Sequence, residues 1–74
     1  MFIKLTNNDP EGSCFIRAGR VAAVVPIMAY RSGMRDEANA TLVVYGSTNG
    51  EDSSVVVKES ADEVMAAIMQ VISA

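Results

Sequence analysis

Hydrophobic and polar residues alternate in short runs over most of the chain, which is the pattern of half-buried β-strands. The runs that fit a strand are residues 2–6, 13–17, 21–30, 41–45 and 53–58. After the first run, Pro10 and Gly12 suit a type I turn, and after the fourth, Asn49-Gly50 tolerates the positive φ angles of a tight hairpin. The pattern therefore predicts a mainly antiparallel sheet in which the fourth run is apolar enough to be central.

Residues 21–30 are the ambiguous part of this pattern, because their apolar residues also fall at helical spacing. Pro26 argues against a long helix, since it removes a hydrogen-bond donor and clashes with the preceding turn. The β-branched residues favour a strand. We therefore predict an extended segment that Pro26 confines to a sheet edge or divides with a bulge. One strand, a bulged strand and a partly helical segment all remain open, and residues 31–40 are predicted to form a charged loop.

The end of the chain predicts a helix that begins after Ser60. The Ser60 hydroxyl can accept a hydrogen bond from the Glu63 N–H, while the Glu63 carboxylate accepts one from the Ser60 N–H, which makes a capping box. Apolar residues of this helix fall within one wide stripe, and Met69 lies on its border. The stripe comprises Ala61, Val64, Met65, Ile68, Val71 and Ile72.

Together these segments predict an α+β fold, a small antiparallel sheet of four or five short strands covered by one C-terminal helix. The 74 residues leave room for one domain, residues 1–74. A chain of this size hides only about 60% of the surface that it exposes when unfolded. Since 50% of the residues are hydrophobic, we expect an apolar patch at the surface. That patch predicts a dimer or a complex with a protein partner.

The residue types that carry most enzyme chemistry are missing or isolated. The chain has no histidine and one cysteine, Cys14, which excludes an intramolecular disulfide and the common zinc sites. Ser60 lacks a conventional base and is expected to cap the helix, and Cys14 is expected to pack as a small core residue. We therefore predict that the protein is not an enzyme and has no catalytic residue, metal, cofactor or small-molecule substrate.

Charge is distributed unevenly along the chain. Residues 1–35 carry a formal charge of +3 and residues 36–74 one of −6, which gives the net charge of −3. A fold that presents the two parts on different faces would be able to dock through either one. The longest apolar run, residues 21–29, is too short for a membrane span, which takes about 20 residues. With one unpaired thiol and no signal-peptide pattern, we expect a cytoplasmic protein with no membrane partner.

Several stretches of the chain carry a family resemblance. They are Phe2-Ile3-Lys4-Leu5-Thr6, Phe15-Ile16-Arg17-Ala18 with Val21 and Val24, Asn49-Gly50, and Val57-Lys58-Glu59-Ser60 with Glu63-Val64. In these strand, turn and cap signatures, the chain resembles the small FlbD (SwrD) flagellar and swarming-motility family, and similar layouts occur among short bacterial and phage proteins. The resemblance implies an accessory role in motility and no catalytic residue. Residues 26–40 depart from the family pattern through a longer, charged connection.

The function that we expect first is a protein-interaction module that regulates a larger bacterial machine, for example a phage or bacterial protein that binds host RNA polymerase. Its predicted contacts combine arginines, which pair with acidic partners, and methionines, which adapt to partner surfaces. These contacts are Arg31, Met34, Arg35, Met65 and Met69. A CsrA-like regulator that binds nucleic acid is the alternative, opposed by the net negative charge and the absence of tryptophan. Its contacts would be Arg17, Arg20, Arg31 and Arg35.

Overall fold

The computed structural model describes residues 1–9, 11–30, 37–46 and 50–73. Five strands, a short 3-10 helix and one terminal α-helix follow one another along the chain, which confirms the predicted α+β fold. The elements are β1 (Phe2–Asn7), β2 (Gly12–Arg17), η1 (Ala18–Arg20), β3 (Val21–Tyr30), β4 (Glu37–Gly46), β5 (Asp52–Val57) and α1 (Ala61–Ser73).

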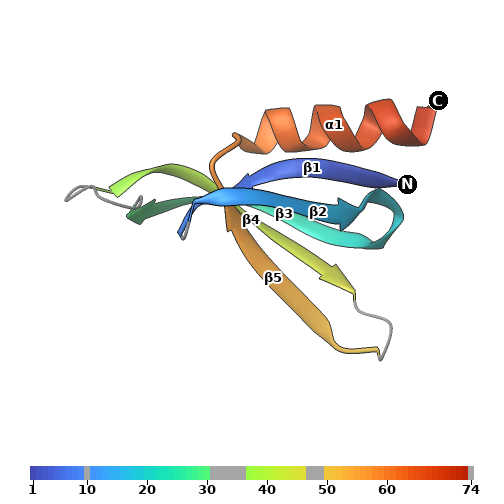
Figure 1. Ribbon diagram of the computed structural model, residues 1–74, viewed down its shortest axis with the longest axis horizontal. Coiled ribbons are helices and arrows are strands. Elements are labelled where there is room, and N and C mark those ends of the chain that lie inside the picture. Colours follow the sequence, from blue (N-terminus) through green and yellow to red (C-terminus); the bar gives the residue numbers. More distant parts are fainter. Residues whose placement is uncertain (10, 31–36, 47–49, 74) are drawn as a thin grey trace.

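All five strands belong to one antiparallel sheet in the order β2-β1-β5-β4-β3. The β1–β2 hairpin and the β3–β4–β5 meander meet where β1 and β5 pair through Asn7 and Val57. A hydrogen bond of 2.8 Å from the Lys58 N–H to the Thr6 carbonyl flanks this seam. From the seam the strands spread apart, and the β4–β5 hairpin reaches away from the helix (Figure 1). The sheet therefore consists of two well-paired parts held together at a short junction.

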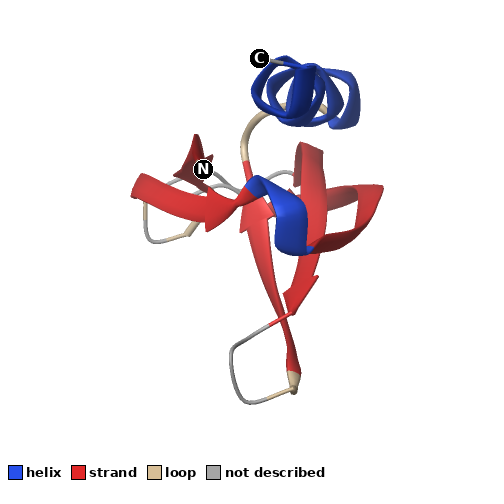
Figure 2. Ribbon diagram, turned by 90° about the vertical axis from the view of Figure 1, so that its right-hand side faces the viewer, coloured by secondary structure: helices blue, strands red, loops and turns tan. Residues whose placement is uncertain are grey.

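Helix α1 covers one face of the sheet, where it contacts β1, η1 and β3 (Figures 1 and 2). Side chains alternate between the two faces along each strand, so β1 buries Ile3 and Leu5 beneath the helix while Phe2 and Lys4 stay exposed. The core formed in this way comprises Ile3, Leu5, Ile16, Ala18, Val43, Val57, Val64 and Ile68.

Glu59 determines the corner between β5 and α1. Its carboxylate accepts hydrogen bonds from the Thr6 N–H at 2.9 and 3.0 Å and from the Thr6 hydroxyl at 3.1 Å. Its backbone carbonyl accepts a hydrogen bond of 2.7 Å from the hydroxyl of Thr41, which is fully buried in β4. The corner thus connects β1 with β4 and sets the direction in which the helix leaves the sheet.

The segment Val21–Tyr30 is a single strand, β3, at the edge of the sheet, as Pro26 predicts. A register shift lies between Val21 and Ala23, so the bulge is near the start of the strand and not at the proline. The prediction of a loop over residues 31–40 is wrong for its last part, because β4 begins at Glu37 and pairs with Tyr30. The long partner strand overrides the weak strand propensity of residues 37–40. Residues 31–36 lie outside the described residues.

The predicted capping box is present at the start of α1. The Glu63 N–H donates to the Ser60 hydroxyl at 3.1 Å, and the Ser60 N–H lies 3.5 Å from the Glu63 carboxylate. The predicted hairpin between β4 and β5 is also present, and Gly50 in its loop has a φ of 85°, in the region that glycine favours. Asn49 and Pro10 lie outside the described residues.

Candidate interaction surface

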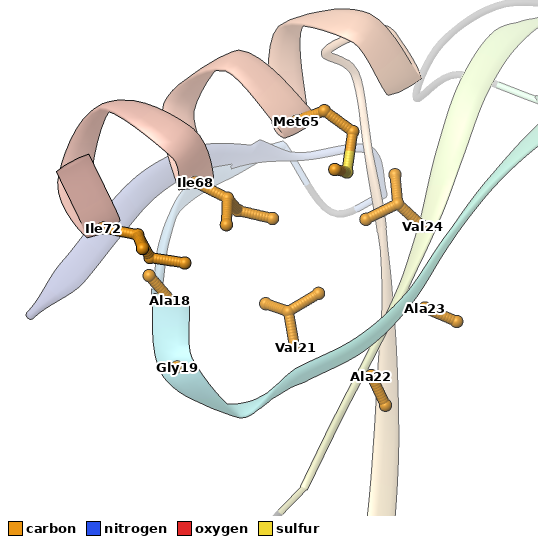
Figure 3. A pocket seen from close by; sticks show the side chains of 9 residues that line it. All are labelled: Ala18, Gly19, Val21, Ala22, Ala23, Val24, Met65, Ile68 and Ile72. Carbon is orange, nitrogen blue, oxygen red and sulfur yellow. The ribbon is translucent and has the colours of Figure 1, made fainter.

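An apolar groove of about 290 Å³ runs between α1 and the start of β3, and we call it the α1–β3 groove. Three helix side chains point into it from one side, and one residue of η1 and two of β3 point toward them from the other (Figure 3). These residues are Met65, Ile68 and Ile72 on the helix and Ala18, Val21 and Val24 across the groove.

The bulge in β3 explains this arrangement. Val21 and Val24 are three positions apart, and in a regular strand they would point to opposite faces of the sheet. The register shift between Val21 and Ala23 adds one residue, so both valines face the helix (Figure 3). The helical spacing that made this segment ambiguous in the sequence is therefore the spacing of a bulged strand. Ala22 and Ala23 also line the groove, but their side chains point away from the helix.

The sheet covers only part of the apolar stripe on α1. Val64 is fully buried and Ile68 nearly so, whereas Met65 is 45% exposed and Ile72 is 61% exposed. Met69, on the border of the stripe, is 56% exposed. The reason is that one side of the stripe packs into the core, whereas the other side faces the groove and solvent. The helix therefore has more apolar surface than the fold uses.

Charged side chains lie at the two ends of the α1–β3 groove, and its lining is uncharged. The carboxyl end of α1 reaches η1, where Arg20 is exposed next to the lining residue Gly19. The amino end of α1 lies near Pro26, and there Asp62 is one of the residues that line a second hollow. The groove thus has an uncharged, mainly apolar lining, with Arg20 next in the chain to one lining residue and Asp62 in the neighbouring hollow.

One of the five predicted partner contacts lines the α1–β3 groove, and a second lies on the same helix outside that lining. Met65 lines the groove and Met69 lies on the exposed side of the same helix. Arg31, Met34 and Arg35 lie outside the described residues, so the loop that they form in the prediction is not placed. Sequence reasoning missed Ile72 and the valines of β3 as binding residues. The helical spacing of those valines, next to two small alanines, was the available signal.

Cys14 lies on β2 with its side chain packed against the core, as predicted for a small core residue. Burial raises the pKa of its thiol, and the negative charge of Glu59 adds to this effect. Within the described part of the chain, no three side chains of the metal-binding types gather into a cluster. Nor does that part contain a helix long and apolar enough to cross a membrane.

No protein-family model, curated protein or solved structure matches the chain. The resemblance to the FlbD family, and the motility role that it implies, therefore stay predictions. The same holds for the expected absence of enzyme activity and cofactors.

Proposed function

We propose that this chain is a non-enzymatic protein-interaction module that binds an apolar segment of a partner protein in the α1–β3 groove. The observation that carries the proposal is the position of Met65 and Ile72, which line an uncharged groove while about half of each side chain stays in water. Burying a side chain of this size fully is worth about 1.5–3 kcal/mol. A partner that covers both would gain a sizeable part of this energy.

The groove suits side chains inserted by a partner better than the addition of a strand to the sheet. β3 is an edge strand, and such edges bind extended peptides through their free N–H and C=O groups. Pro26, in the middle of β3 opposite Thr41, has no N–H and so interrupts that row of donors. The partner that fits is an amphipathic segment with an apolar centre, a basic residue toward Asp62 and an acidic residue toward Arg20.

Within this proposal, the partner that we expect belongs to a larger bacterial machine such as RNA polymerase. An accessory role like that of the FlbD family is the alternative. The uneven charge does not distinguish these partners. Acidic residues of α1 and basic residues of β1 and β2 lie on different sides of the sheet, so the chain is able to dock through either side.

The proposal is tested by capture from the native host with three forms of the tagged chain. Met65→Ser combined with Ile72→Ser should leave the fold intact, because both side chains are largely exposed, and should remove the specific partner. Val25→Ser is the matched control, since Val25 is 41% exposed and lies on the opposite face of β3 from the groove residue Val24. Loss of a protein with the groove variant but not with the control supports the proposal. Equal capture by all three forms contradicts it.

Sedimentation of the purified chain distinguishes a second copy from a foreign partner. If the groove binds another copy, the wild type sediments as a dimer and the Met65→Ser, Ile72→Ser variant as a monomer. A monomeric wild type that still captures a partner through the groove identifies the partner as a different protein.

A further inference from the structure

The β1–β2 hairpin presents aromatic and basic side chains in alternation on its outer face. In the ladder, Phe2 lies opposite Arg17 and Lys4 lies opposite Phe15. Opposed residues share a face of the sheet, and so do residues two apart on one strand. The four side chains therefore form a checkerboard of two phenylalanines and two cations on the face that α1 does not cover. We call this the Phe–Arg face.

The two phenylalanines of this face do not pack into the core. Phe2 is 59% exposed and Phe15 is 64% exposed. The residue that follows each of them in its strand, Ile3 or Ile16, is in the core. The Arg17 guanidinium carbon lies over the Phe2 ring, 5.5 Å from its centre, which is within the range of a cation–π contact. Large aromatic side chains left in water beside cations indicate a surface for a ligand.

The electrostatics of the Phe–Arg face are locally positive although the whole chain is negative. The next pair along the ladder, Thr6 and Ser13, is polar and uncharged, so none of these six side chains is acidic. The carboxylate of Glu59 is near the Thr6 end and already accepts hydrogen bonds from Thr6. A ligand on this face therefore meets two cations and two rings without a competing carboxylate among them.

We propose that the Phe–Arg face binds single-stranded nucleic acid, independently of the α1–β3 groove on the other side of the sheet. Phe2 and Phe15 are diagonal neighbours in the ladder, at a typical separation of roughly 7–8 Å, which leaves room for two bases that do not stack on each other. One base stacks on Phe15 and the other on the Phe2–Arg17 pair, while Lys4 and Arg17 contact phosphates.

An acidic peptide is the other ligand that two cations would attract. The exposed rings decide between the two, because every base has a face that stacks on an aromatic ring and an acidic side chain has none. Stacking also predicts little sequence preference, because every base has a face that can stack on an aromatic ring. The net negative charge of the chain predicts weak binding that depends on salt.

The experiment is fluorescence anisotropy of the full chain with oligo-dT of about eight nucleotides, and with a poly-glutamate peptide of equal charge. The logarithm of the affinity should fall with that of the salt concentration with a slope of about −1.4, the value for two phosphate contacts. Phe15→Ala should weaken binding by about 5- to 150-fold, and Phe15→Tyr should restore it. Arg17→Gln should reduce the slope by about 0.7.

Ile72→Ser in the groove is the control and should bind oligo-dT like the wild type. The proposal is overturned if oligo-dT does not bind at low salt, or if folded Phe15→Ala, checked by circular dichroism, binds as tightly as the wild type. Binding of poly-glutamate with the same affinity as oligo-dT overturns it as well, because attraction by charge alone would then suffice.

Discussion

The two sides of helix α1 differ in how completely they are packed. On the side of the Glu59 corner, Val64 of the helix and Val57 and Thr41 of the sheet are 0% exposed. On the other side, Met65 directly follows Val64 and is 45% exposed in the groove. The same helix therefore uses one side to hold the fold, and in our proposal the other side binds a partner. Changes on the first side should alter stability, and changes on the second should alter binding.

The largest effect is expected from a truncation in the packed side. Leu5 is 2% exposed beneath the helix, so Leu5→Ala should lower the free energy of unfolding by about 2–5 kcal/mol through lost contacts and a cavity. Urea unfolding measures this loss. Ile72→Ala removes a side chain of similar size that lines the groove and is 61% exposed. This change should lower the free energy of unfolding by less than about 1 kcal/mol. Similar losses for the two variants would mean that the groove is closed by packing.

The next effect concerns the Glu59 corner. Glu59→Ala leaves the Thr6 N–H and hydroxyl without their acceptor, and should lower the free energy of unfolding by about 1–3 kcal/mol. Glu59→Gln keeps an oxygen that can accept one of these hydrogen bonds and should cost less. Thermal unfolding of the two variants compares them. Equal melting temperatures for Glu59→Ala and wild type would show that the corner does not hold the sheet together.

A smaller effect is expected at the start of the helix. Ser60→Ala removes the acceptor of the Glu63 N–H and should cost about 0.5–2 kcal/mol, toward the low end because these groups are exposed. Asp62→Ala is the control, because it removes a first-turn charge outside the capping box. If the two variants have the same melting temperature, the hydrogen bond at Ser60 contributes no more to stability than the interaction of one charge with the helix dipole does.

The smallest effect appears only at alkaline pH. Because burial raises the pKa of the Cys14 thiol, the folded chain binds the thiol proton more tightly than the unfolded chain does. The tighter binding of this proton stabilises the folded chain. The stabilisation is fully present below the thiol pKa of the unfolded chain and is lost as the pH rises through the thiol pKa of the folded chain. Cys14→Ser should therefore flatten the fall in melting temperature above neutral pH. Thiol labelling of the folded wild type should require a higher pH than that of an unfolded peptide, and equal labelling profiles would contradict the burial of Cys14.

Much of this fold follows from local patterns in the sequence. Alternation located the strands within a few residues, because one side of each strand must be apolar to face a core. The capping box at Ser60 and Glu63 placed the start of the helix, since it depends only on groups three residues apart. Pro26 indicated an edge strand because a missing N–H is tolerated where no neighbour needs it. The candidate contacts Met65 and Met69 were predicted because flexible methionine side chains adapt to partner surfaces.

Other features were decided only by the tertiary structure. The extension of β4 back to Glu37 depends on its pairing with β3, and the facing of Val21 and Val24 depends on a bulge that lies near the start of β3 and not at Pro26. How much of the stripe on α1 is buried depends on where Glu59 directs the helix, through hydrogen bonds to strands far away in the sequence. The Phe–Arg face requires the register of β1 against β2. Local propensity acts within a few residues, whereas register, strand order and helix placement arise from contacts between distant segments and so emerge only when the whole chain packs.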